Sequence, residues 1–153
     1  MLLGVDAFAS LLIVCVLVGI TPSAFPVIVA RDVYALSSSV LSIVFSVFTA
    51  SLAIILASPD DKFVRFLEDE GFYQEILWGF LLTLGALFVA LVYSIGAFSW
   101  SSYQLESKVL HQHRVGVLAC GGLVSYALGS TFTSALSAIR YARTRAKYLR
   151  AVA

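Results

Sequence analysis

Long apolar runs dominate the chain, and they limit its possible folds more than any other feature. Three of them, 35–57, 76–98 and 115–138, contain no Asp, Glu, Lys or Arg. Each is long enough to cross a bilayer, which takes about 20 mainly apolar residues in a helix. The sequence therefore predicts an all-α fold, a polytopic transmembrane helical bundle.

A fourth apolar run, 3–21, is less uniform. It contains Asp6 near its start, and Pro22 and Pro26 follow it. A helix of about thirty residues, continued through both prolines, would be about 45 Å long, which is too long for one upright crossing. The prolines therefore either end the first helix at the end of this run or kink it. We expect four crossings in one integral membrane domain, 1–153.

Composition excludes several classes of protein. Hydrophobic residues make up 60% of the chain and charged residues only 12%, whereas an ordinary soluble domain has about 25% charged residues. So little charge does not cover a soluble surface. This excludes a disordered protein, a nucleic-acid-binding domain and an average cytosolic enzyme. Within the four runs Asp6 is the one charged residue, so the charge is concentrated in the water-facing segments.

The placement of Lys and Arg predicts the orientation, because such residues are in excess in cytoplasmic segments. With four crossings, both termini and the segment 58–75 share one side of the membrane. That side holds seven basic residues, Lys62, Arg65, Arg140, Arg143, Arg145, Lys147 and Arg150, and the other holds three, Arg31, Lys108 and Arg114. We expect a bacterial inner-membrane protein with both termini in the cytoplasm. If 3–21 does not cross, the N-terminus lies outside.

The last apolar run carries a small residue at every fourth position. The row consists of Gly121, Ser125, Gly129, Thr133 and Ser137. Small residues at this spacing let helix backbones approach closely, which is how helices associate in lipid. We expect this row to pack against another helix, either within the chain or in a second copy of a homo-oligomer.

The second apolar run carries a stripe of hydroxyl residues, Ser39, Ser42, Ser46 and Thr49. Their hydroxyls either line a pore or hydrogen-bond to the preceding turn of their own helix. No carboxylate, Lys or His lies in the middle of a run. This argues against a proton pump or an ion-coupled transporter, which usually need a titratable residue there.

The segment between the second and third runs predicts a short amphipathic helix on the cytoplasmic surface, over about 59–70. Ser58 is a favourable N-cap, Pro59 suits the first turn, and Gly71 suits the C-cap. Its acidic residues are Asp60, Asp61, Glu68, Asp69 and Glu70.

The tail, 139–153, holds five basic residues and no acidic one. Arg140, Arg143, Lys147 and Arg150 share one face of a helix that continues the last run. We expect this face to contact anionic lipid headgroups. The alternatives are docking against the acidic segment 58–75 or recruitment of an acidic cytoplasmic protein. Binding of nucleic acid is not expected, because the tail is short and carries no recognised motif.

Residues that commonly carry chemistry are few. His111 and His113 reach one metal ion only in an extended segment, and no third ligand follows, so we expect a solvated loop. Cys15 and Cys120 lie in apolar runs and are expected to be small buried hydrophobic residues. No nucleophile elbow, zinc-protease motif or phosphate-binding loop is present. We therefore predict no enzyme activity, no catalytic residue, no metal and no cofactor.

The arrangement of two crossings, the segment SPDDKFVRFLEDEGFY at 58–73 and two further crossings resembles small bacterial membrane proteins of anti-phage defence cassettes. In architecture it is similar to the transmembrane subunit of Kiwa-type defence. The resemblance implies homo-oligomers, a cytoplasmic partner, and membrane sensing or disruption during phage infection. It assigns no functional residue.

These observations predict a non-enzymatic, oligomeric membrane protein that forms a pore or serves as a membrane anchor or sensor for a cytoplasmic partner. The alternatives are a small transporter, a lipid-handling subunit, or an accessory subunit of a larger membrane complex.

Overall fold

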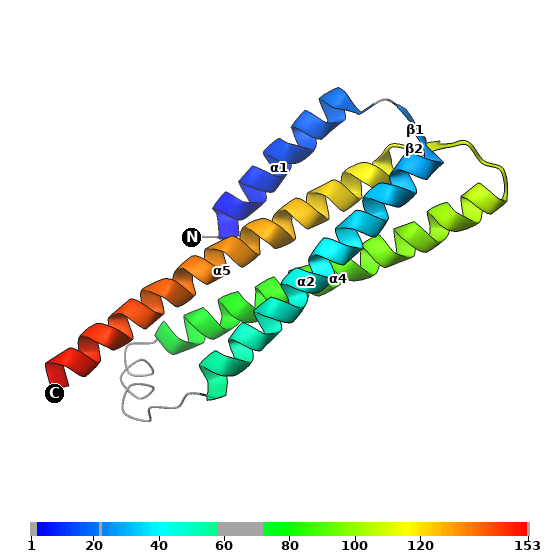
Figure 1. Cartoon of the computed structure of the whole chain (residues 1–153). Helices are drawn as coiled ribbons and strands as arrows, with labels where there is room; N and C mark the ends of the chain where they lie inside the picture. Colours follow the sequence, from blue (N-terminus) through cyan, green and yellow to red (C-terminus); the bar gives the residue numbers. More distant parts are fainter. Residues whose placement is uncertain (1–2, 22, 58–71, 153) are drawn as a thin grey trace.

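The computed structural model describes residues 3–21, 23–57 and 72–152 (Figure 1). These residues form four helices, α1 (Leu3–Ile20), α2 (Val27–Ala57), α4 (Phe72–Glu106) and α5 (Val115–Val152), and two short strands, β1 (Ala24–Pro26) and β2 (His111–His113). Helices α2, α4 and α5 form an elongated bundle, and α1 lies along α5. The predicted helical fold is confirmed. The predicted surface helix at 59–70 lies outside the described residues.

The two strands hold one end of the bundle together, which we call the strand end. They pair antiparallel, with Ala24 opposite His113 and Pro26 opposite His111. The α1–α2 and α4–α5 connections therefore lie side by side (Figure 1). The C-terminus of α2, the start of α4 and the last turns of α5 lie at the opposite end, which we call the basic end. These strands were not predicted, because three residues are too few for a periodic signal.

The prolines end the first helix and do not bend it. Helix α1 stops at Ile20, and α2 begins directly after Pro26. The backbone N–H of Val27 donates to the carbonyl oxygen of Leu110 at 3.1 Å, which joins the start of α2 to the segment before β2. Proline, which lacks an N–H and restricts φ, suits such a boundary.

The helices extend beyond the apolar runs that predicted them. Helix α2 starts at Val27 and not at residue 35, and its first turns include Arg31 and Asp32, whose side chains lie 3.2 Å apart. Helix α4 continues past residue 98 to Glu106. An apolar run marks the part of a helix that suits a membrane, whereas backbone hydrogen bonds decide where the helix itself ends.

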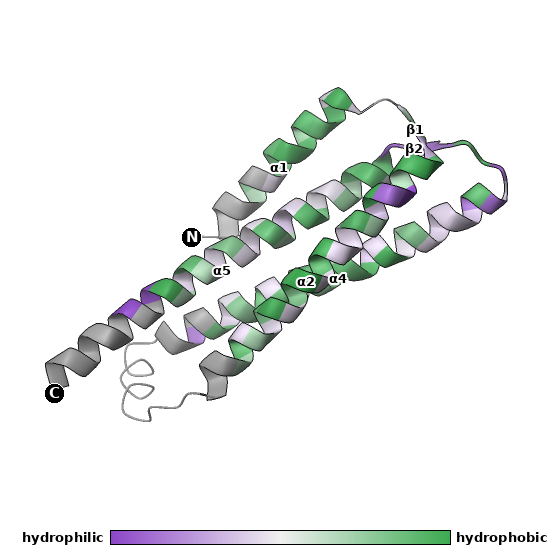
Figure 2. Ribbon diagram, viewed as in Figure 1, coloured by the Kyte–Doolittle hydropathy of each residue, from purple (hydrophilic) through white to green (hydrophobic). Residues whose placement is uncertain are grey.

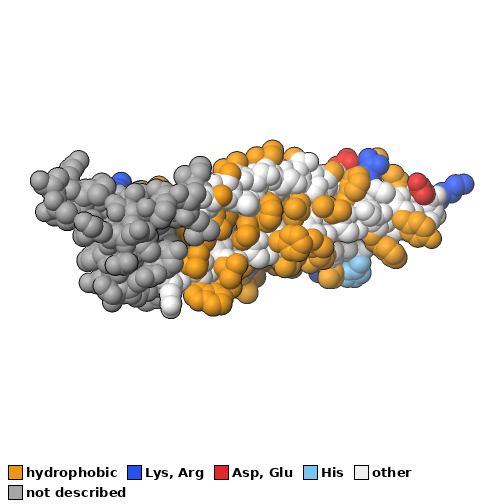
Figure 3. Space-filling view, turned by 90° about the horizontal axis from the view of Figure 1, so that it is seen from below, with side chains coloured by type: hydrophobic (Ala, Val, Ile, Leu, Met, Phe, Trp, Pro, Cys, Tyr) orange, Lys and Arg blue, Asp and Glu red, His pale blue; other side chains and the backbone are white. Residues whose placement is uncertain are grey.

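Three helical segments are long and apolar enough to cross a membrane: Val27–Ala53, Leu77–Glu106 and Val115–Arg140. The apolar part described in α1, Ser10–Ile20, is shorter. The strongly hydrophilic residues lie toward the two ends of the bundle (Figure 2), and hydrophobic side chains are exposed along the face shown in Figure 3. These features fit a multi-pass integral membrane protein. The predicted fourth crossing is not among the three segments.

Helix α4 packs along both α2 and α5, and the core lies where the three helices meet. Phe48 of α2 stacks on Phe80 of α4, with ring centroids 5.1 Å apart. Ala90 of α4 and Ala127 of α5 are fully buried, and such small residues allow close helix packing. Helices α2 and α5 contact each other much less than either contacts α4.

Candidate functional site

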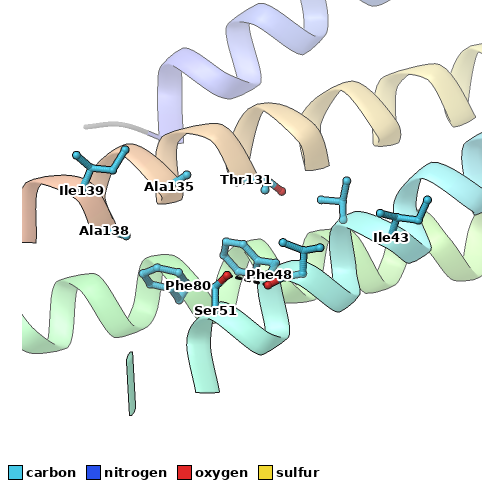
Figure 4. Close-up of a pocket in the computed structure, with 10 residues that line it drawn as sticks. Ile43, Phe48, Ser51, Phe80, Thr131, Ala135, Ala138 and Ile139 are labelled. Atoms are coloured by element: carbon cyan, nitrogen blue, oxygen red, sulfur yellow. Dashed lines mark hydrogen bonds between the residues drawn. The ribbon is translucent and has the colours of Figure 1, made fainter. Parts of the chain in front are cut away.

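A lateral groove lies between α2 and α5 in the half of the bundle nearer the basic end (Figure 4). Its cavity volume is about 380 Å³. Phe48 and Phe80 line it and are buried, whereas Ile43, Val47 and Ile139 are at least half exposed along its edges. Short side chains of α5, including Ala135 and Ala138, leave the space open.

The lining of the groove offers no spare hydroxyl donor. Ser51 donates to the carbonyl oxygen of Val47 at 2.8 Å (dashed in Figure 4), and Thr131 donates to that of Ala127 at 2.7 Å. The other lining side chains are hydrocarbon. A molecule in the groove therefore contacts an apolar surface whose hydroxyl protons are already used.

Basic residues follow the groove residues in the sequence of α5, on a different face of the helix from the groove. Ile139 lines the groove, and Arg140 and Arg143 are exposed on the next turn of the same helix. The helix runs without a break to Val152, so the predicted helical continuation of the tail is confirmed. Lys147 and Arg150 lie in its last turns. The acidic residues Asp60, Asp61, Glu68, Asp69 and Glu70 lie outside the described residues.

The row of small residues on α5 lies partly against α1. A Cβ added at Gly121 would lie 2.9 Å from Cδ1 of Leu17, and one added at Gly122 would lie 2.9 Å from Cγ2 of Val14. The remaining members of the row, Ser125, Gly129, Thr133 and Ser137, are partly buried. Contact within the chain thus uses at least Gly121 of the row.

The hydroxyl stripe of α2 lies on the outside of the bundle. Ser39, Ser42, Ser46 and Thr49 are exposed. Each donates to the carbonyl oxygen four residues earlier, at 3.0, 2.7, 2.9 and 2.8 Å respectively. A pore lined by these residues therefore needs additional copies of the chain.

A buried hydroxyl cluster that was not predicted from the sequence joins α4 and α5. Oγ1 of Thr83 lies 2.8 Å from Oγ of Ser130 and 2.7 Å from Oγ of Ser134. Thr83 also donates to the carbonyl oxygen of Gly79 at 2.9 Å. All three hydroxyl residues are buried. The four-residue spacing of Ser130 and Ser134 was a possible signal, but it does not indicate which helix they meet.

A second polar cluster lies at the strand end and depends on Gln112 of β2. Ser101 donates to Oε1 of Gln112 at 3.3 Å, and Nε2 of Gln112 donates to the hydroxyl oxygen of Tyr34 at 3.4 Å. His111 and His113 are exposed on either side. Because neighbouring residues of a strand point to opposite faces, Gln112 alone turns inward. The prediction of a wholly solvated loop was therefore wrong for this residue.

Cysteine and histidine do not gather into a ligand set in the described part of the chain. Cys120 is buried, as predicted, but Cys15 is exposed on α1, contrary to the prediction. No group of three or more His, Cys, Asp or Glu side chains among the described residues is arranged to hold a metal ion.

No family model, curated protein or solved structure matches the chain.

Proposed function

We propose that this protein is a non-enzymatic inner-membrane anchor that presents the basic face of α5 to an acidic cytoplasmic partner. The observation that carries this proposal is the continuity of α5 from the apolar segment Val115–Arg140 to Val152. Twelve residues of helix beyond Arg140 extend about 18 Å. A single continuous helix thus joins the proposed membrane segment to a basic surface that suits a negatively charged protein.

We further propose four crossings, with the basic end and both termini in the cytoplasm. Helix α1 has 18 residues, or about 27 Å, which is close to the roughly 30 Å hydrocarbon core of a bilayer. It runs antiparallel to α5, from the side of the basic end toward the strand end (Figure 1). The excess of Lys and Arg at the basic end supports a cytoplasmic placement of that end.

The working form that we propose is a homo-oligomer, supported by the hydroxyl stripe of α2, Ser39, Ser42, Ser46 and Thr49, which is exposed on the single chain and suits contact with another helix better than contact with lipid. The resemblance to membrane proteins of anti-phage cassettes suggests defence against phage as its setting. In that setting the protein would respond to a change in the membrane, and its response would alter the state of the bound cytoplasmic partner.

Affinity purification of the full chain from native membranes tests whether the protein anchors a cytoplasmic partner. We expect an acidic cytoplasmic protein to copurify in fixed stoichiometry. Lys147→Gln and Arg150→Gln, singly and together, should weaken this association, because they remove charge from the basic face. Arg145→Gln is the control, since it removes one charge from another face of the same helix. Absence of a partner, or a partner retained equally by all variants, would contradict the proposal.

A pore is the second candidate function, and the exposed hydroxyl stripe of α2 favours it. If copies of the chain turn this stripe toward a shared axis, its oxygens would line a polar path. The test is dye-reported depolarisation of liposomes containing the protein. Ser42→Leu with Ser46→Leu should abolish depolarisation, whereas Val40→Leu, off the stripe on the same helix, should not. Liposomes that stay polarised with the unmodified chain would eliminate the pore.

A further inference from the structure

We infer that Trp78 and Trp100 of α4 lie in the two headgroup interfaces of a lipid bilayer, and that contacts between helices set the same two levels on α1, α2 and α5. The level of a residue is its height along the axis of the bundle. The height of Trp100 is called the strand-end level, and the height of Trp78 the basic-end level. This inference rests on the proposed membrane placement and adds to it the position of each lipid interface on the chain.

The two tryptophans of α4 are one bilayer thickness apart. They are separated by 22 residue steps, or about 33 Å of helix, and a hydrocarbon core is about 30 Å thick. This separation is about six full turns, so both side chains lie on nearly the same face of α4. Each is 61% exposed. Because its ring is apolar and its N–H is polar, tryptophan is enriched at both interfaces of membrane proteins.

A contact near the strand end sets the strand-end level on α5. Oγ of Ser94 lies 3.5 Å from Sγ of Cys120, and Ser94 precedes Trp100 by six residues. Helix α4 ends at the strand end and α5 begins there, so the two helices are antiparallel (Figure 1). The strand-end level therefore meets α5 six residues before Cys120, at Arg114.

The hydroxyl cluster sets the basic-end level on α5. Thr83 follows Trp78 by five residues and contacts both Ser130 and Ser134. The basic-end level therefore meets α5 about five residues beyond the middle of that pair, at Ser137. The two levels are 23 residue steps apart on α5 and 22 on α4, although separate contacts set them. No Asp, Glu, Lys or Arg lies within 115–139, so the basic tail begins just outside the basic-end level.

Helix α1 fits between the same two levels. Its Leu17 lies against Gly121 of α5, and the two helices are antiparallel (Figure 1). At this register α1 begins at Leu3, about two residues inside the basic-end level, and ends at Ile20, about four residues inside the strand-end level. Its one charged residue, Asp6, lies in its first turn. Helix α1 therefore extends across most of the hydrocarbon core, which supports the fourth crossing.

Helix α2 has its ion pair close to the strand-end level. Phe45 lies against Phe88 of α4, with ring centroids 6.5 Å apart. Phe88 lies twelve residues before the strand-end level on α4, so this level meets α2 near Val33. The ion pair of Arg31 and Asp32 is adjacent. Charged side chains are costly in hydrocarbon and far less so among headgroups.

The strand pair lies on the water side of the strand-end level. Strand β2 precedes Arg114, and β1 directly precedes α2. The sheet has only two strands, and the unpaired backbone groups along its open edges need water, because such edges do not occur in hydrocarbon. Tyr103, one turn beyond Trp100 and 62% exposed, adds a second ring at this interface, with ring centroids 6.1 Å apart.

Depth-dependent quenching of tryptophan fluorescence tests the two levels in phosphatidylcholine vesicles. The acyl chains carry bromine either close to the headgroup, the shallow label, or close to the chain ends, the deep label. Trp100 is measured alone in Trp78→Phe, and Trp78 alone in Trp100→Phe. The matched control is Val89→Trp with both native tryptophans replaced by Phe. Val89 is 54% exposed and lies eleven residues from each tryptophan, on nearly the same face of α4.

We expect the shallow label to quench Trp78 and Trp100 more strongly than the deep label does, and the order to reverse for Val89→Trp. The difference in depth should be about 16 Å, the length of eleven helical residues. Leu12→Trp, also made without the native tryptophans, tests α1. Leu12 is 53% exposed near the middle of α1, and its register between the two levels predicts stronger quenching by the deep label.

Stronger quenching of Trp78 or Trp100 by the deep label would overturn the inference, because that tryptophan would lie in hydrocarbon. No quenching of the two, with Val89→Trp quenched, would overturn it as well, since protein would then cover them. Stronger quenching of Leu12→Trp by the shallow label would refute the levels assigned to α1. No quenching of any reporter would refute the membrane placement itself. If Val89→Trp fails to give a helical circular dichroism spectrum, Val92→Trp, at a position 53% exposed on the same helix, replaces it.

Discussion

The Thr83 hydroxyl of α4 lies 2.7 Å from the Ser134 hydroxyl of α5, and both residues are buried between apolar helices. Ser130 joins the same cluster at 2.8 Å. In a bilayer such a contact specifies which faces of two helices meet, because hydrocarbon supplies no competing partner.

Thr83→Val should therefore destabilise the packing of α4 on α5. The side chain keeps its shape but loses both contacts between helices, and we expect a cost of about 1 kcal/mol, as measured for hydrogen bonds between membrane helices. Unfolding in mixed detergent, followed by circular dichroism, measures it. Thr49→Val is the control, because that hydroxyl is exposed and bonds only within its helix. Equal losses in both variants would show that the cluster adds nothing.

Gly121→Leu should displace α1 from α5. A Cβ added at this position would lie 2.9 Å from Cδ1 of Leu17, and overpacking of this kind costs about 1–3 kcal/mol. We expect faster hydrogen exchange in α1 while α2 and α4 stay protected. Gly96→Leu provides the comparison, because a Cβ there meets nothing within 4 Å. Unchanged exchange in α1 would mean that this glycine does not position the helix.

Gln112→Ala should loosen the strand end. Ser101 and Tyr34 would both lose a hydrogen-bond partner, at about 0.5–1.5 kcal/mol for each bond. Hydrogen exchange at the amide of Val27, which donates to Leu110, reports the change and should accelerate. His111→Ala, an exposed neighbour on the same strand, should leave this exchange rate as it is. The same acceleration in both variants would argue against a special role for Gln112.

Thiol labelling of intact cells tests the proposed orientation. In a background with Cys15→Ser and Cys120→Ala, His111→Cys should react with a membrane-impermeant maleimide. Arg143→Cys should react only after the membrane is permeabilised, because the excess of basic residues is expected to hold that end in the cytoplasm. An N-terminal epitope should also need permeabilisation if α1 crosses. Its detection on intact cells would leave three crossings.

The sequence alone determined the features that depend on neighbouring residues. Uncharged runs of more than twenty residues around Phe48, Leu87 and Ala127 predicted the helices that suit a membrane, because the length and hydropathy of a segment are local properties. The same holds for the basic face from Arg140 onward, whose spacing predicted the helix that α5 continues to Val152. Pro22 and Pro26 indicated that the chain turns between α1 and α2, since proline interrupts helical hydrogen bonding.

The tertiary structure decided which helix faces meet. Hydroxyl residues occur on several helices, and only the packing of α4 on α5 separates the buried Thr83 from the exposed Ser42. The register of β1 on β2 turned Gln112 inward and left His111 outside. The lateral groove exists because α4 holds α2 and α5 apart where α5 carries Ala135 and Ala138. Such contacts join residues far apart in the chain, so periodicity within one helix does not reveal them.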